Sequence, residues 1–89
     1  MNQAVINHER GFVVVDFPKG ATIPPALHHK LEDSGFYKMG AIGRVQYVSS
    51  QPDESLRNLS YELGSEIVQA YNAGKYREML YPKKKESHG

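Results

Sequence analysis

Residues 53–73 read DESLRNLSYELGSEIVQAYNA, and this stretch decides the fold. Its apolar residues recur at steps of three and four, which places them on one side of an α-helix. They are Leu56, Leu59, Leu63, Ile67, Ala70 and Tyr71. Ser50 or Asp53 is suited to cap the start of the helix, and Gly74 is suited to end it. The stretch therefore predicts a long amphipathic helix near 53–73 that supplies most of the core.

The same periodicity predicts which side chains this helix buries. We expect three of its apolar residues to pack against two valines of a strand. The predicted cluster is Val13, Val15, Leu59, Leu63 and Ile67. Gly64 lies in the middle of the helix, where glycine costs about 1 kcal/mol relative to alanine. We therefore expect Gly64 to allow the close approach of another backbone.

Two strands are predicted ahead of the helices. Residues 12–17, FVVVDF, form a β-branched and aromatic run that Pro18 stops, which is typical of a strand. The shorter apolar run at residues 4–6 is suited to pair with it as a hairpin, with Gly11 supplying a positive φ in the turn.

The middle of the chain predicts a short helix and then more strand. Residues 25–34 favour a helix, because proline is tolerated in a first turn and Gly35 is placed to cap the end. Residues 44–49 have strand propensity. The segment 36–49 is compatible with a tight hairpin from residue 37 to residue 48, or with one strand and a glycine-marked bulge. The sequence alone does not choose between the hairpin and the bulged strand.

These elements together predict an α+β fold of order β(β)αβ(β)α. We expect a small, mostly antiparallel sheet of three to four strands, with one long C-terminal amphipathic helix packed on one face. A chain of 89 residues holds one core, so we expect a single soluble domain over residues 1–82. Residues 83–89 are predicted to form a basic, flexible tail.

The composition argues against several kinds of chemistry. Cysteine is absent, which excludes disulfides, thiolate metal sites and thiol catalysis, and fits a reducing compartment. The sequence contains neither a Gly-x-Ser-x-Gly elbow nor a glycine-rich phosphate loop. We therefore expect a cytoplasmic protein that is not an enzyme, with no cofactor, no small-molecule substrate and no membrane segment.

Two adjacent histidines raise the question of a metal site. Two pairs of residues are spaced four apart, so the members of each pair lie on the same side of a helix. The pairs are His28 with Glu32 and His29 with Asp33. Each pair offers two ligands, whereas zinc and iron centres take at least three from the protein. We interpret them as exposed helix pairs and expect no metal.

Protein docking is the function that this sequence favours. The chain has more tyrosine than so small a core easily buries, and tyrosine is enriched at interfaces because it combines apolar area with a hydroxyl. The predicted protein-binding residues are Tyr37, Tyr47, Tyr61, Tyr76 and Tyr81. An adaptor, an inhibitor or an assembly subunit fits this composition, and self-association would use the same surfaces.

Nucleic-acid binding is the alternative from another class. Residues 71–89 carry five basic and two acidic side chains, with tyrosines between the cations, a mixture able to follow a phosphate backbone and stack on bases. The candidate residues are Lys75, Arg77, Lys83, Lys84 and Lys85. The net charge of the whole chain is only +1, a small excess for a dedicated nucleic-acid binder, so this hypothesis comes second.

Overall fold

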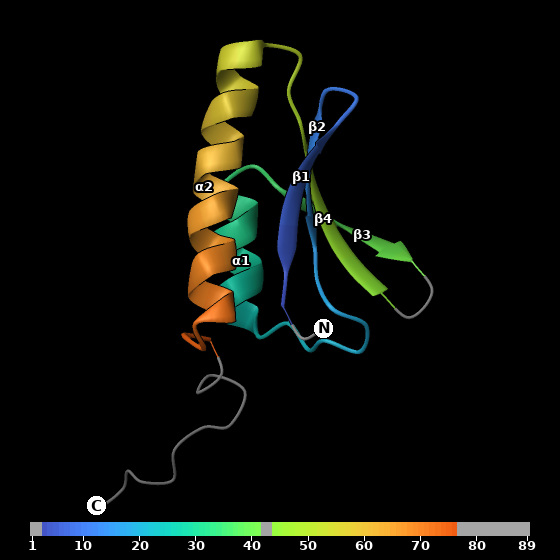
Figure 1. Ribbon diagram of the computed structural model, residues 1–89, viewed down its shortest axis with the longest axis vertical. Helices are drawn as coiled ribbons and strands as arrows, with labels where there is room; N and C mark the ends of the chain where they lie inside the picture. The colour runs from blue at the N-terminus through green and yellow to red at the C-terminus, as the bar shows by residue number, and fades with distance from the viewer. Residues whose placement is uncertain (1–2, 42–43, 77–89) are drawn as a thin grey trace, which may run out of the picture.

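The computed structural model describes residues 3–41 and 44–76, which form two layers: a four-stranded sheet with both helices on one face (Figure 1). The elements are β1 (Val5–Glu9), β2 (Phe12–Asp16), α1 (Pro25–Asp33), β3 (Tyr37–Ala41), β4 (Arg44–Ser50) and α2 (Glu54–Asn72). The predicted α+β class and the element order are confirmed. The segment 36–49 contains a hairpin, because β3 and β4 pair antiparallel with Tyr37 opposite Val48.

The strands are ordered β1-β2-β4-β3, and each neighbouring pair is antiparallel. The β1–β2 turn contains Arg10 at φ 52° and Gly11 at φ 86°, so two successive residues have the left-handed backbone of a tight hairpin turn. The positive φ predicted for Gly11 is therefore confirmed. Because side chains alternate along a strand, one face of the sheet meets the helices and the other remains open.

The core lies between the covered face of the sheet and the two helices. Val13, Val15 and Phe17, which alternate along and just beyond β2, are at most 1% exposed. The helices contribute four buried apolar side chains to this cluster, namely Leu27, Leu31, Ile67 and Val68. The predicted burial of Val13, Val15 and Ile67 is thus confirmed.

The ends of α2 follow from its sequence. Oδ1 of Asp53 accepts hydrogen bonds from the backbone N–H of Ser55 at 2.7 Å and of Leu56 at 3.3 Å, which satisfies two amides that have no partner within the helix. Gly74 follows the other end with φ 91°, a backbone conformation that suits glycine. Asp53, rather than Ser50, is the residue that caps the helix.

The predicted burial of Leu59 and Leu63 is wrong. Leu59 is 51% exposed and Leu63 is 36% exposed, whereas Ser60 and Gly64 face the sheet. A β-carbon added to Gly64 would lie 2.7 Å from Cδ1 of Ile6 and 2.9 Å from Cζ of Phe36. These two side chains fill the space between the sheet and α2. The small residues of α2 therefore face the sheet, and its leucines lie to one side. Gly64 allows close packing as predicted, but against side chains rather than another backbone.

Candidate functional site

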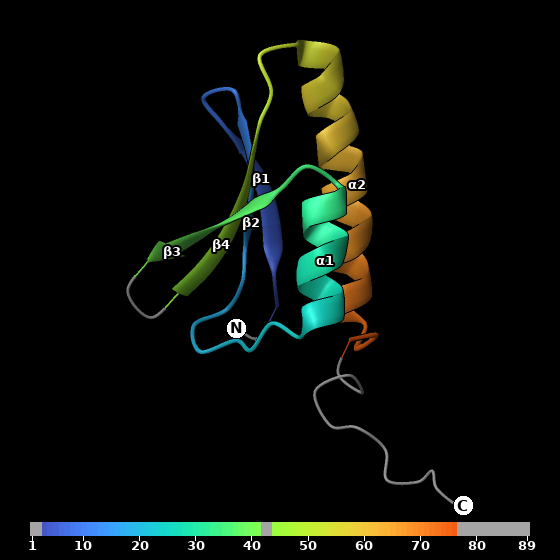
Figure 2. The same cartoon turned by 180° about the vertical axis from the view of Figure 1, so that it is seen from behind.

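α1 covers only part of the length of α2. Figures 1 and 2 show α1 beside the C-terminal half of α2, while the N-terminal half of α2 extends past the end of α1. Where the helices lie together, Lys30 of α1 and Glu66, Ile67 and Ala70 of α2 line a hollow of about 130 Å³ with Lys75 and Tyr76. Ile67 and Ala70 therefore mark the flank of α2 that faces α1.

The exposed leucines continue this same flank. At 100° per residue, Leu56, Leu59 and Leu63 fall with Ile67 and Ala70 in an arc of about 80° around the helix axis. Leu56 is 48% exposed, similar to Leu59, and Leu63 is the most covered of the three. We call Leu56, Leu59 and Leu63 the leucine ledge. The ledge is thus the part of the α1-facing flank that reaches past α1.

A firm base lies under the ledge. The hydroxyl of Ser49 in β4 donates a hydrogen bond to that of Ser60 in α2 at 3.2 Å, and both side chains are buried. The loop from α1 to β3 passes this point, since a β-carbon on Gly35 would lie 3.8 Å from the Ser49 hydroxyl. Next to it, Phe36 is 1% exposed and packs against Gly64. The backbone that carries the ledge is therefore held to the sheet by buried contacts.

Acidic side chains outnumber basic ones along α2. From Asp53 to the end of α2, four exposed carboxylates accompany a single basic residue. The carboxylates are those of Asp53, Glu54, Glu62 and Glu66. The basic residue, Arg57, is half-buried and donates from Nη1 to the carbonyls of Gln51 at 2.8 Å and Pro52 at 3.0 Å. In the last turn of α1, exposed Glu32 and Asp33 accompany exposed Lys30, which leaves a net charge of −1 near the loop that passes under the ledge.

The open face of the sheet carries a second apolar surface. Phe12, Tyr37 and Met39 are 42%, 57% and 51% exposed, and they point away from the helices. Val14 and Val48 lie opposite each other between these side chains, and a shallow hollow of about 220 Å³ lies over Phe12, Val14, Met39 and Val48. This surface is apolar, but the charges at its border are mixed, because Glu9 lines the hollow and the paired Asp16 and Arg44 lie at the other end of the strands.

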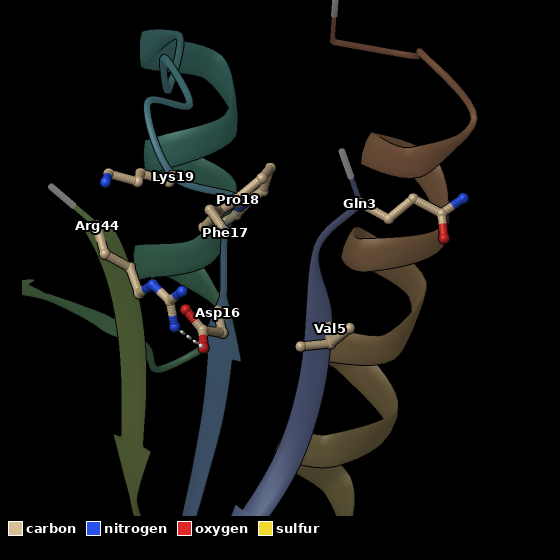
Figure 3. A pocket seen from close by; sticks show the side chains of 7 residues that line it. All are labelled: Gln3, Val5, Asp16, Phe17, Pro18, Lys19 and Arg44. Carbon is tan, nitrogen blue, oxygen red and sulfur yellow. Dashed lines mark hydrogen bonds and ion pairs between the residues drawn. The ribbon is translucent and has the colours of Figure 1, made fainter. Parts of the chain in front are cut away.

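Asp16 and Arg44 border a larger hollow of about 430 Å³ whose lining mixes polar and apolar side chains (Figure 3). The two side chains point toward each other, with Nη1 of Arg44 3.3 Å from Oδ2 of Asp16. The other carboxylate oxygen of Asp16, Oδ1, is buried without a hydrogen-bond partner among the described residues. Lys19 and Gln3 contribute further polar groups to the wall. Arg44 balances the Asp16 carboxylate and Lys19 adds one positive charge, so the lining has a small net charge of +1.

His28 and Glu32 of the first predicted pair belong to a partly buried polar cluster. The hydroxyl of Tyr47 lies 2.7 Å from Nδ1 of His28, and Nε2 of His28 lies 3.2 Å from Oε2 of Glu32. Burial raises the pKa of the Tyr47 hydroxyl above its usual value, and the Glu32 carboxylate adds to this. In the His28 tautomer that donates Nε2–H to the Glu32 carboxylate, Nδ1 accepts a hydrogen bond from the Tyr47 hydroxyl. The cluster joins α1 to β4, and Tyr47 is 0% exposed, out of reach of a substrate.

His29 and Asp33 stay on the exposed side of α1. Within residues 3–41 and 44–76, no group of three or more histidine, aspartate or glutamate side chains is placed to hold a metal ion. The interpretation of His28 and Glu32 as a helix pair agrees with their geometry, although His28 is half-buried rather than exposed.

The tyrosines predicted to bind protein do not form one surface. Tyr37 is exposed on the open face, whereas Tyr47 is fully buried and Tyr76 is 6% exposed. Tyr61 is half-buried on α2 and packs on the ring of His8, with 4.7 Å between the ring centroids. Tyr81 lies outside the described residues. Of the four described tyrosines in this prediction, Tyr37 alone offers a large exposed ring.

Most of the cations predicted to contact nucleic acid lie outside the described residues, namely Arg77, Lys83, Lys84 and Lys85. Lys75 is described and exposed, and its Nζ lies 5.8 Å from the centroid of the Tyr76 ring. That ring is buried, so it cannot stack on a base without leaving its packing site.

The width of the apolar arc of α2 is a sequence feature that indicates the ledge, and the spacing of the leucines alone does not contain it. The apolar residues of α2 include Tyr61 and Val68 as well as the leucines, so they cover too wide an arc for one buried face. A helix of that kind buries one part of its arc and exposes the rest. The small residues Ser60 and Gly64 mark the buried part.

Comparison with protein-family models, with curated proteins and with solved structures gives no match to this chain. In the part of the chain that the structure describes, no helix combines the length and the apolar character needed to cross a membrane.

Proposed function

We propose that this protein acts without catalysis, by docking on another protein, and that the leucine ledge is its contact surface. The observation that supports the proposal is the exposure of Leu56, Leu59 and Leu63, from 36% to 51%, in a helix whose neighbouring residues Ser60 and Gly64 are buried. Three large apolar side chains in line, on an anchored backbone and with an acidic rim, are typical of an interaction site.

The energetics fit a docking role. Full burial of a leucine side chain contributes roughly 1.5–3 kcal/mol, so covering three half-exposed leucines contributes roughly 2–4 kcal/mol in total. This is enough for the apolar centre of an interface but too little to offset the cost of association, so polar contacts at the rim must add to it. An adaptor, an inhibitor or an assembly subunit in the cytoplasm would suit such a surface, the compartment being proposed from the lack of cysteine.

The test is affinity capture with the full-length chain as bait, in native lysate, with and without nuclease. The ledge variant carries Leu56→Gln, Leu59→Gln and Leu63→Gln. The matched control carries Phe12→Gln, Tyr37→Gln and Met39→Gln, three changes of similar exposure on the open face. We expect the wild type and the control to retain one stoichiometric protein through nuclease and moderate salt, and the ledge variant to lose it.

Two other results would contradict the proposed docking surface or the proposed class of partner. Capture of a protein that the ledge variant retains and the control loses would move the docking site to the open face. Co-purifying nucleic acid, lost when Lys75, Arg77, Lys83, Lys84 and Lys85 are replaced, would favour the alternative function. Its affinity should fall by about 0.7–0.9 log units per phosphate contact for each log unit of salt.

A further inference from the structure

The leucine ledge has the length and the residue spacing of a surface on which another helix packs. α2 has 19 residues and α1 has 9, which correspond to lengths of about 28 Å and about 13 Å. Among residues 3–41 and 44–76, no helix therefore lies beside about 15 Å, or about three helical turns, of the α1-facing flank. Leu56, Leu59 and Leu63 occupy this length at the spacing of three and four residues that helices use to pack on one another.

The charge around the ledge restricts what covers it. Glu62 is exposed on α2, Asp53 stands at its start, and the two carboxylates of Glu32 and Asp33 outnumber Lys30 in the last turn of α1. Glu66 is also exposed and lines the hollow beside Lys30 and Lys75. The nearby Arg57 is occupied by two backbone carbonyls. A second copy of α2 would bring the same carboxylates against these, and like charges at an interface oppose association. A partner with basic side chains beside its apolar residues would instead be attracted.

We propose, building on the docking function above, that the leucine ledge binds a cationic amphipathic helix of a partner protein, which lies end to end with α1 against α2. Its apolar residues, three and four apart, cover Leu56, Leu59 and Leu63. Its lysine and arginine side chains face Glu62, Glu66 and the acidic end of α1. This is the mode in which an amphipathic helix places its apolar face on a complementary apolar surface.

The probe is a synthetic peptide of about 18 residues, with leucines at helical spacing and lysines elsewhere, long enough to form a helix on contact. A second peptide replaces every lysine with glutamate. Binding of each to the full-length protein is measured by fluorescence anisotropy. We expect the lysine peptide to bind and the glutamate peptide to bind at least about tenfold more weakly.

Three variants locate the site. Leu59→Gln should weaken binding of the lysine peptide about tenfold, whereas Met39→Gln, a change of equal exposure on the open face, should alter it less than about twofold. The double reversal Glu62→Lys with Glu66→Lys should exchange the preference, so that the glutamate peptide binds more tightly. Circular dichroism of each variant checks that the fold is kept.

Other outcomes would overturn this inference. Equal binding of both peptides, or lysine-peptide binding that survives Leu59→Gln, would remove the cationic helix and leave the docking function to the capture experiment. Sedimentation showing a dimer that Leu59→Gln dissociates would make a second copy the occupant.

Discussion

Tyr47 shows how one residue joins the two layers of the molecule. Its ring is buried in the core, and its hydroxyl forms a hydrogen bond with Nδ1 of His28, so a strand and a helix share one partly buried hydrogen bond. Tyr47→Phe keeps the ring and removes this bond, which should cost about 1 kcal/mol of unfolding free energy. Denaturant titration measures the loss. Tyr37→Phe is the control, because its ring is exposed, and a similar loss there would contradict the assignment.

The same hydroxyl predicts the response to high pH. The pKa of Tyr47 is raised in the folded protein, first by burial and then by Glu32, so above about pH 10 the unfolded chain releases a proton that the folded chain still holds. The stability that depends on this proton is present below about pH 10 and is lost as the pH rises through the folded-state value. Tyr47→Phe should therefore flatten the alkaline loss of stability. An unchanged slope above pH 10 would show that other groups cause it.

At the scale of the element, Gly64 fixes how α2 sits on the sheet. Gly64→Ala gains up to about 1 kcal/mol of helix propensity but inserts a methyl group into a space bounded by Ile6 and Phe36, and overpacking costs about 1–3 kcal/mol. We expect a net destabilisation near 1 kcal/mol by thermal and denaturant unfolding. Ile6→Val removes the nearest atom, Cδ1, so in a double-mutant cycle it should recover part of the loss. Additive effects would mean that Ile6 does not limit the approach.

The two sides of α2 should differ strongly when truncated. Ile67→Ala removes a side chain that is 3% exposed and should cost about 2–5 kcal/mol, whereas Leu59→Ala removes one that is 51% exposed and should cost less than about 1 kcal/mol. Denaturation of these two variants makes the comparison within one helix. Equal losses would mean that Leu59 is covered in solution.

The sequence predicted the existence and bounds of α2 but not its rotation. Asp53 and Gly74 are local signals, so they could be interpreted without knowing the rest of the chain. The rotation depends on Ile6 and Phe36, which come from positions distant in the sequence and occupy the space above Gly64. The apolar stripe of α2 contains the three leucines as well as Ile67, and its sequence does not show which of these side chains the core buries.

For the whole molecule, the same distinction between local and distant information applies to the candidate site. The run at residues 12–17 and the glycine at 11 were sufficient for a hairpin, because turns and strands are specified locally. Tyrosine content indicated an interface, yet Tyr47 and Tyr76 are buried, since only the packed chain decides which rings the core takes. The leucine ledge follows from the short length of α1 relative to α2, a relation between two elements that the pattern of neither one contains.

That difference in length also has a dynamic consequence. The first six residues of α2 are exposed or half-exposed, whereas Ser60, Gly64, Ile67 and Val68 tie the rest of the helix to the core. Segments with few buried contacts open at lower free-energy cost than the core does. Amide hydrogen exchange should therefore be faster at residues 57–59 than at residues 66–70, which mass spectrometry resolves. A ligand that covers the ledge would slow exchange mainly at the faster end, so the least protected turns of α2 would report its arrival.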